Sequence, residues 1–339
     1  MSGPLCLGVI GCGQAASEYH WPFWHELRDA AVTAVCDLDP GRASAAAKRF
    51  GARAFASPEL LLDEADIDAL FIFVPPFAHG DLELRAAERG LPFFVEKPVG
   101  LDLLRAQRTE AEVAARGVMT SVGYDWRYSR AVERARTELA GREIALLQGF
   151  WLGSALGGSP PSWWTRQELS GGQLVEQATH IVDLLVHLGG EVRQVNCRQA
   201  PGFARNARVD VAGAGAVLVE MASGAVGAIV SACGLPHPTL RCGLVVSADG
   251  LHVEVTRQRA RLYRGGERET YDAPTASSDS PYLREDQAFV DAVRSGDPSG
   301  IRCSYADGVR TLAVCLAANE SARTGRPVAP AALTGAGGA

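Results

Sequence analysis

The feature that most constrains the fold is a glycine-rich turn directly after an apolar run near the N-terminus. Residues 5–10 have the pattern of a buried strand, and Gly-Cys-Gly-Gln-Ala-Ala follows at once over residues 11–16. This is the G-x-G-x-x-A pattern in the strand-to-helix context of a dinucleotide site. Gly11 permits the tight turn, Gly13 lets the backbone approach a pyrophosphate, and Ala16 allows close packing of helix on strand. The turn therefore predicts a βαβ unit that holds phosphates at the start of its helix.

An acidic residue stands where the ribose of a bound dinucleotide would lie. A second strand-like run, 31–36, ends at Asp37, roughly the expected distance beyond the turn. A carboxylate accepts hydrogen bonds from the ribose 2′-hydroxyl and repels a 2′-phosphate, and Asp39 adds negative charge nearby, so NAD is favoured. Arg42 leaves NADP open, because its guanidinium could pair with a phosphate. The alternative for Arg42 is a solvated charge on a helix face.

Lysine is rare in this chain, and one of the two lysines stands in a distinctive tripeptide. The sequence has 33 lysines and arginines, of which only Lys48 and Lys97 are lysines. Lys97 lies in Glu96-Lys97-Pro98, directly after the apolar run 92–95. Its compact ammonium can aim three donors at one oxygen, and open α/β sheets bind their ligands at the carboxyl ends of strands. Lys97 is therefore a candidate to bind a substrate oxygen, with a chance surface position as the alternative.

Strand-like and helix-like segments alternate through the first third of the chain. After Asp37 come apolar runs at 70–74, 92–95 and 118–122, with helical patterns between them. This alternation predicts a parallel sheet with helices on both faces. We therefore expect an α/β Rossmann domain, with a doubly wound parallel sheet, over residues 1–123.

The pattern changes after this first domain. A single long helix is predicted over 171–188, and short strand-like runs without intervening helices then argue for an antiparallel sheet. These runs cover 209–211, 216–221, 225–231, 240–247 and 251–255. With helices at 282–294 and 305–323, they predict an α+β domain with an open, largely antiparallel sheet over 124–328. A flexible tail is expected at 329–339.

Composition limits the class of protein. A length of 339 residues favours two domains. The formal net charge of −6, with mixed signs, argues against a nucleic-acid partner. No apolar run is long enough to span a membrane, and the N-terminus does not have the pattern of a secretion signal, so we expect a cytoplasmic protein. The eight cysteines are scattered without a C-x-x-C pair, which indicates neither a disulfide framework nor a zinc site.

The predicted long helix carries four polar residues at regular spacing. Glu176, His180, Asp183 and His187 fall at i, i+4, i+7 and i+11, so they would share one stripe of that helix. The alternative is a solvated polar face. No metal is predicted, because one helix without convergent ligands elsewhere offers too few.

Together these motifs resemble the Gfo/Idh/MocA oxidoreductase family, over nearly the whole chain. The resemblance implies a Rossmann domain followed by an α+β domain, NAD or NADP as cofactor, and homodimers or homotetramers built on the second sheet. It places the family's catalytic lysine at Lys97 and its catalytic histidine at His180. Glu176 stands where the family usually has aspartate, so the substrate of any one relative does not transfer.

The expected reaction moves a hydride between nicotinamide and a secondary alcohol or ketone of a sugar, cyclic polyol or related compound. His180 would act as the acid or base, and Lys97 would stabilise the substrate oxygen. Glu176 would orient the imidazole or bind a neighbouring hydroxyl. Asp183 is as consistent with a buried structural role as with a catalytic one.

Further contacts are predicted on both sides of the site. Cofactor contacts are expected from Gly11, Gly13, Gln14, Ala15, Asp37, Arg42, Val74, Pro75, His79, Glu96 and Lys97. Substrate contacts are expected from Lys97, Tyr124, Arg127, Tyr128, Trp163, Glu176 and His180. Core packing or subunit contact is the alternative for the aromatic residues and Arg127, and an ordinary exposed histidine is the alternative for His79.

Other function classes remain open on the same frame. They are an NAD-dependent glycosidase, an imine reductase, and a non-catalytic sensor that binds nicotinamide cofactor and a partner protein. The presence of both Lys97 and His180 argues against the sensor.

Overall fold

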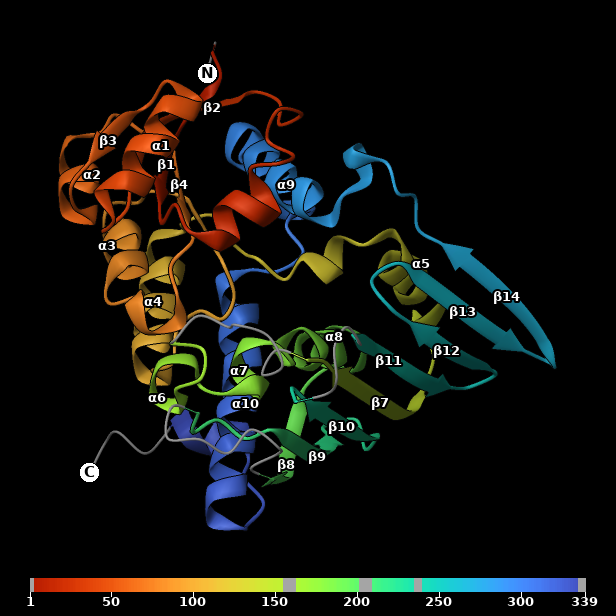
Figure 1. Ribbon diagram of the computed structural model, residues 1–339. Coiled ribbons are helices and arrows are strands. Elements are labelled where there is room, and N and C mark those ends of the chain that lie inside the picture. The colour runs from red at the N-terminus through yellow and green to blue at the C-terminus, as the bar shows by residue number, and fades with distance from the viewer. Residues whose placement is uncertain (1–2, 155–162, 201–208, 235–239, 335–339) are drawn as a thin grey trace. The chain divides into compact units, whose positions relative to one another are not determined.

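The computed structural model describes residues 3–154, 163–200, 209–234 and 240–334 (Figure 1). The chain divides into two compact units, which are described separately. The first contains residues 1–128 and 275–309, and the second contains 129–274 and 310–339. A stretch far along the chain thus packs with the N-terminal residues. The predicted boundary between functional domains at 123/124 stays a prediction.

The first unit is built on a six-stranded parallel sheet with the order β3-β2-β1-β4-β5-β6. Its strands are β1 (Leu5–Ile10), β2 (Ala30–Cys36), β3 (Arg53–Phe55), β4 (Ala69–Ile72), β5 (Phe93–Val95) and β6 (Thr120–Val122). This is the doubly wound order, in which the chain reverses direction across the sheet between β1 and β4. The predicted Rossmann fold is confirmed.

Helices connect these strands. They are the π-helix η1 (Ala15–His20), α1 (Pro40–Phe50), α2 (Pro58–Glu64), the 3-10 helix η2 (Pro76–Ala78), α3 (Leu82–Glu88), α4 (Leu103–Arg116) and the 3-10 helix η3 (Asp125–Tyr128). Asp39 caps α1 by accepting hydrogen bonds from the backbone of Gly41 at 2.8 Å and Arg42 at 3.3 Å. Asp39 is therefore committed to helix capping as well as adding charge near Asp37.

The returning stretch adds helix α9 (Pro281–Ser295) to the first unit, together with the short 3-10 helices η5 (Ser277–Asp279) and η6 (Pro298–Gly300). Phe289 and Val290 of α9 belong to the hydrophobic core that contains Leu5, Val9 and Phe71. The rings of Phe71 and Phe289 meet edge to face with their centroids 5.4 Å apart. The core of the Rossmann unit is therefore completed by residues from the last fifth of the chain.

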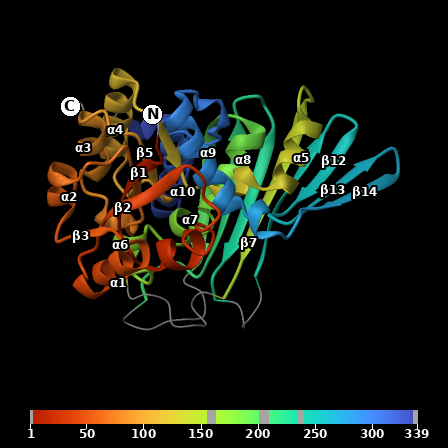
Figure 2. The same cartoon turned by 90° about the horizontal axis from the view of Figure 1, so that it is seen from above.

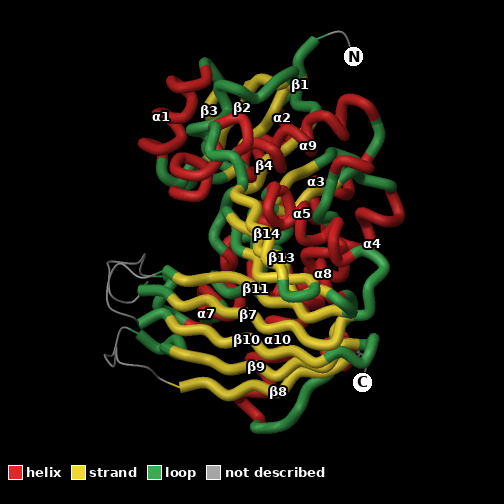
Figure 3. The backbone as a smooth tube through the Cα atoms, turned by 90° about the vertical axis from the view of Figure 1, so that its right-hand side faces the viewer, coloured by secondary structure: helices red, strands yellow, loops and turns green. Residues whose placement is uncertain are grey.

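The second unit contains an eight-stranded sheet with the order β14-β13-β12-β11-β7-β10-β9-β8 (Figure 3). Its strands are β7 (Ile144–Leu152), β8 (Val192–Ala200), β9 (Ala214–Met221), β10 (Val226–Ala232), β11 (Arg241–Ala248), β12 (Leu251–Val255), β13 (Arg259–Arg264) and β14 (Glu267–Asp272). All neighbours are antiparallel except β7 and β10, which are parallel. The predicted largely antiparallel sheet is confirmed.

Helices α5 (Arg130–Leu139), α6 (Gln167–Ser170), α7 (Gln173–Glu176) and α8 (Thr179–Gly189) belong to this unit, and α10 (Tyr305–Thr324) begins in the first unit and ends in the second. Helix α8 packs against β7 and β11, and α5 packs against β12, β13 and β14 (Figure 2). Among the described helices, none combines the length and the apolar character needed to cross a membrane.

Three expectations about the second unit differ from the structure. The helix predicted over 171–188 is broken into α7 and α8, because the amides of Gln177 and Ala178 both bond to the carbonyl of Gln173. The run 209–211 is not a strand, and only Val209 makes an isolated bridge. Val328, the last residue before the expected tail, pairs with Val195. Within that tail Pro330–Thr334 form the 3-10 helix η7, and residues 335–339 lie outside the described part.

The packing of α9 leads to a first prediction. Phe289→Ala should lower the free energy of unfolding by about 3–5 kcal/mol, because it leaves a cavity against Phe71 and Phe94. Chemical denaturation followed by circular dichroism would measure this. Leu104→Ala, at a side chain on α4 that is 52% exposed, is the control and should change stability by less than about 0.5 kcal/mol. Equal effects would contradict the placement of Phe289 in the core.

Candidate active site

The glycine-rich turn lies between the end of β1 and η1. The backbone N–H of Gly11 donates to the carbonyl of Cys36 at 2.8 Å, and Gly11 has a φ of 95°. A Cβ at Gly11 would overlap the backbone carbonyl of Phe73, so only glycine fits. At Gly13, by contrast, the nearest atom to such a Cβ would be Arg42 Nη1 at 3.6 Å. Packing within the protein does not demand glycine at 13, and the free space there fits a bound diphosphate.

Asp37 follows β2 and braces this turn. Its carboxylate accepts the backbone N–H of Cys12 at 2.7 Å and that of Asp39 at 2.8 Å. Each oxygen thus receives one hydrogen bond and retains acceptor capacity for a ribose hydroxyl. The sequence predicted the ribose role but not the brace to Cys12.

The thiol of Cys12 stays neutral within the turn. Burial, followed by the charge of Asp37, raises its pKa to about 12. A thiolate at this position would repel a diphosphate anion, and the raised pKa keeps that charge away at neutral pH.

The other predicted cofactor contacts differ in their exposure. Gln14 is exposed and donates to Glu18 at 2.8 Å, and Arg42 lies 3.7 Å from Asp39 across an exposed ion pair. Ala15, Val74 and Pro75 are half-buried. His79 is buried and its Nδ1 bonds to Glu83, so the alternative of an ordinary exposed histidine is wrong.

The tripeptide Glu96-Lys97-Pro98 follows β5 at its carboxyl end, as predicted. The backbone N–H of Glu96 continues the sheet by donating to Ile72 at 2.9 Å, and Lys97 is half-buried. The Glu96 side chain lies over Gly123, where a Cβ would come 2.7 Å from Oε1. Gly123 is therefore glycine because the carboxyl group of Glu96 occupies the space above it.

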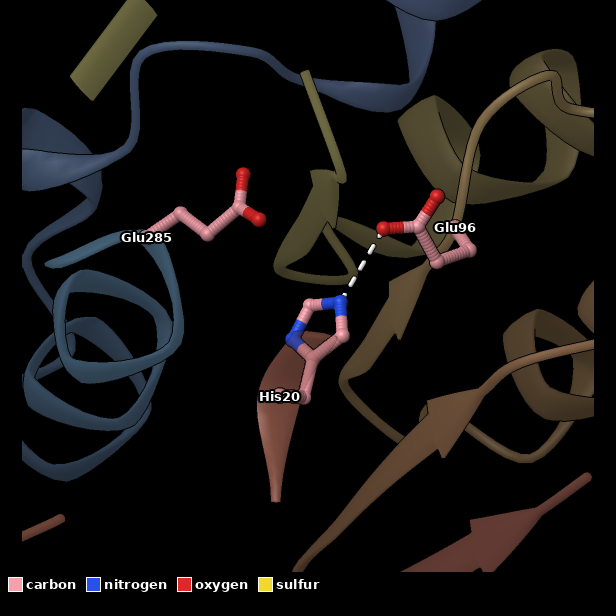
Figure 4. A group of neighbouring side chains, drawn as sticks. All are labelled: His20, Glu96 and Glu285. Atoms are coloured by element: carbon pink, nitrogen blue, oxygen red, sulfur yellow. Dashed lines mark hydrogen bonds and ion pairs between the residues drawn. The ribbon is translucent and has the colours of Figure 1, made fainter. Parts of the chain in front are cut away.

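Behind Glu96 lies a buried polar cluster (Figure 4). His20 Nε2 is 3.0 Å from Glu96 Oε1, and His20 Nδ1 is 2.9 Å from Asp286 Oδ2. The carboxylate of Glu285 points toward the same region. Donor atoms of His20, Glu96 and Glu285 lie within 4.8 Å of one another, and all three residues are buried.

In the second unit, the predicted catalytic histidine lies in the first turn of α8. The ring of His180 stacks on Trp151 of β7 with centroids 5.6 Å apart and an interplanar angle of 16°. Glu176, at the end of α7, accepts the indole N–H of Trp164. Both Glu176 and His180 are half-buried. The two residues are thus one turn apart in sequence but belong to separate helices.

The predicted polar stripe is not a solvated face. Asp183 is 1% exposed and accepts the hydroxyl of Thr311 at 3.0 Å, which is the buried structural role left open by the sequence. His187 is half-buried. The prediction that these four polar residues share one helix was wrong. The helix breaks after Glu176, so Glu176 lies on α7 and the other three lie on α8.

The aromatic residues after β6 are core residues of the first unit. Tyr124, Arg127 and Tyr128 are buried. Arg127 donates to the carbonyl of Arg302 at 2.6 Å, and the Tyr128 hydroxyl accepts the N–H of Arg302 at 2.9 Å. Burial raises the pKa of Tyr128 well above its usual range. These contacts fit the packing alternative, whereas Trp163 in the second unit is half-buried and packs beside Trp164.

Comparison with known proteins identifies the family. Residues 5–124 match the family model described as "Oxidoreductase family, NAD-binding Rossmann fold", and residues 124–257 match the GFO/IDH/MocA C-terminal domain. The chain belongs to the GFO/IDH/MocA oxidoreductase family. It is an NAD-dependent oxidoreductase, and the open glycine turn and the free acceptors of Asp37 fit that cofactor.

Relatives extend over most of the chain. It is 28% identical over 309 residues to scyllo-inositol 2-dehydrogenase (NAD(+)) from Bacillus subtilis, with 87% of each chain covered. It is 29% identical over 325 residues to inositol 2-dehydrogenase 4 from Saccharopolyspora erythraea, with 92% of each covered. Among solved structures, levoglucosan dehydrogenase in complex with NADH and levoglucosan has a TM-score of 0.84 at 20% identity, covering 96% of this chain and 99% of the other. That likeness shows a shared fold.

One polar residue of this GFO/IDH/MocA protein was missed by the motifs. Gln173 begins α7, directly after Gly171 and Gly172, and is 4% exposed. Neither its amide oxygen nor its amide nitrogen has a hydrogen-bond partner within the described residues. A buried amide without hydrogen-bond partners is destabilising. No sequence pattern predicts where such an amide will occur.

Gln173 provides a second prediction. Gln173→Met keeps the shape but removes two unpaired polar atoms, so the free energy of unfolding without ligand should rise by about 1–3 kcal/mol. Gln167→Met is the matched control. Its amide donates to the carbonyl of Gly171 at 2.8 Å, and losing that bond should lower stability by about 1 kcal/mol. Thermal and urea unfolding would measure both, and a destabilised Gln173 variant would contradict the unpaired amide.

Proposed function

We propose that this protein is a dehydrogenase that moves a hydride between nicotinamide C4 and a secondary alcohol or ketone of a cyclic polyol or sugar. The observation that carries the proposal is Lys97, which follows β5 at the carboxyl end of the sheet. Ligands of open α/β sheets bind at this edge. The names of the inositol dehydrogenases, together with levoglucosan dehydrogenase, support the substrate class.

Each side chain has a proposed task in the reaction. NAD supplies the hydride acceptor or donor when it is bound. Lys97 donates hydrogen bonds to the substrate oxygen and stabilises negative charge as it develops there. His180 takes the hydroxyl proton in oxidation and returns it in reduction. Trp151 supports this role by stacking on the imidazole and fixing the plane of its ring.

Substrate recognition is assigned to the segment around His180. Glu176 is held by Trp164 and offers its remaining acceptor sites to a substrate hydroxyl. The amide of Gln173 offers both a donor and an acceptor, which suits neutral hydroxyl groups because each of them can also donate and accept. We assign to Trp163 a contact with the apolar face of a ring.

We also propose a homodimer or homotetramer through the open face of the second sheet. Leu146, Leu218, Val226 and Val230 are large apolar side chains that are exposed on β7, β9 and β10. Leu146 and Val226 are paired in register, and Leu218 is paired with Ala228, so these side chains share one face. Figure 3 shows this sheet face-on.

The cofactor assignment is tested by titrating nucleotide-free protein with NADH and NADPH and following nicotinamide fluorescence. We expect saturable binding with NADH preferred. Asp37→Asn should weaken NADH by about tenfold and NADPH less, since the ribose acceptor is lost while an amide oxygen can still brace Cys12. Asp39→Asn is the control. Equal weakening of both cofactors in the Asp37 variant would remove the ribose assignment, and no binding of either would refute the proposed function.

The catalytic assignment is tested with myo-inositol, scyllo-inositol and levoglucosan as substrates. Lys97→Met should lower kcat at least 100-fold, because a preorganised charge at the substrate oxygen is lost, and should leave the Kd for NADH within about threefold. His180→Gln should lower kcat by about 100-fold or more at neutral pH. Lys48→Arg is the control for loss of a lysine. Normal turnover by the Lys97 variant would refute its role.

A further inference from the structure

A buried histidine of the first unit lies between two carboxylates from distant parts of the chain. His20 ends η1 and is 0% exposed. Its Nδ1 faces both oxygens of Asp286 on α9 at 3.0 and 2.9 Å, and its Nε2 faces Oε1 of Glu96 at 3.0 Å. The indole N–H of Trp24 donates to Asp286 at 2.6 Å and fixes that carboxylate.

With Asp286 and Glu96 both ionised, the contacts place a proton on each nitrogen of the imidazole. Burial raises the pKa of Asp286, and the positive charge of His20 opposes that rise. A neutral imidazole has one donor and one acceptor nitrogen, and its acceptor would then face a carboxylate oxygen without a hydrogen between them. Burial on its own lowers the pKa of His20, but the charge of Asp286 and the hydrogen bonds to Asp286 and Glu96 raise it to about 10. Rings of Phe73, Phe94 and Tyr282 surround the imidazole at centroid distances of 4.6, 5.6 and 5.3 Å. His20 is therefore a fixed cation in an aromatic surrounding.

We infer that the His20 imidazolium, anchored by Asp286, is a positioning residue for Lys97, acting through the carboxylate of Glu96. This inference rests on the proposed role of Lys97. Glu96 and Lys97 are adjacent in the chain just beyond the end of β5, so the backbone that the Glu96 side chain anchors is also the backbone from which Lys97 projects. Holding Glu96 against His20, with its oxygen over Gly123, fixes the backbone from which Lys97 projects.

The imidazolium also supplies Glu96 with a counter-charge. A buried carboxylate requires one, and His20 provides it at 3.0 Å from Oε1. Without His20, Glu96 would compete with the substrate oxygen for the neighbouring lysine.

The same donor atoms could in principle hold a cation, since His20, Glu96 and Glu285 come within 4.8 Å of one another. A metal would need the lone pair of His20 Nε2, and in the imidazolium a proton shared with Glu96 occupies that lone pair. Proton and metal exclude each other at this atom. The observed contacts on both sides of the ring favour the proton.

Nitrogen-15 NMR of histidine-labelled protein tests the charge directly. We expect both nitrogens of His20 to remain protonated from pH 6 to about pH 9, with Glu96→Gln lowering the pKa because a negative charge is removed. Stability linked to His20 should be fully present below pH 6.5 and be lost as the pH rises toward about 10. A neutral His20 at pH 7, or stoichiometric Zn²⁺ or Mn²⁺ bound to the purified protein and lost in Glu96→Gln, would overturn the inference.

The effect on Lys97 can be measured without a substrate, because the chain has only two lysines. Reductive methylation with carbon-13 gives one dimethyl signal for each lysine, and Lys48→Arg assigns them. We expect His20→Gln to shift the Lys97 signal, whereas His25→Gln, at a side chain that is 69% exposed, leaves it in place. If His20→Gln does not fold, Glu96→Ala serves in its place, because it removes the carboxylate that links His20 to the backbone before Lys97. An unmoved Lys97 signal would overturn the inference.

Kinetics separates positioning from a merely structural role. His20→Gln should lower kcat at least tenfold and leave the Kd for NADH within threefold, and adding Glu96→Gln to it should restore part of kcat by removing the unpaired charge. If the losses of kcat in the His20→Gln and Glu96→Gln single variants simply add in the double variant, the proposed link through Glu96 is overturned. If the proposed function itself is wrong, Lys97→Met retains turnover while His20→Gln still moves the Lys97 signal, so the two failures are distinguishable.

Discussion

The close approach of Gly11 to the backbone of Phe73 is the constraint on which the nucleotide site depends. It brings the turn after β1 against the chain leaving β4, at the place where the direction of the sheet reverses. Asp37 then ties the same turn to the end of β2 through Cys12. The shape of the turn is therefore set by three neighbouring strands, and space remains above Gly13.

The acidic groups of the first unit divide into those that face a cofactor and those that face inward. Asp37 is half-buried and keeps acceptor capacity toward solvent, whereas Asp286 is buried and committed to His20 and Trp24. Glu96 belongs with the inward group although it is adjacent to Lys97. Glu96 therefore has a cationic partner on its buried side, within the first unit.

Much of the first unit could be predicted, because its strands are short apolar runs and its turns carry glycine. The second unit was harder. Strand β14 is almost wholly exposed, so its sequence shows no alternation of apolar residues. Charged pairs such as Arg259 with Asp272 join it to β13. The break between α7 and α8 depends on a shared carbonyl acceptor, which no periodicity reveals. His20 and Asp286 are 266 residues apart, and only the fold brings them together.

The return of α9 into the first unit has a consequence for synthesis of the chain. A ribosome that has made only the first 128 residues has synthesised all six parallel strands but none of the residues of α9. The partner of His20 and the ring that packs on Phe71 are still missing at that stage. The nascent N-terminal part must therefore wait, with part of its apolar interior uncovered, until more than half of the remaining chain has emerged. Vectorial folding, one unit after the other, is not available to this topology.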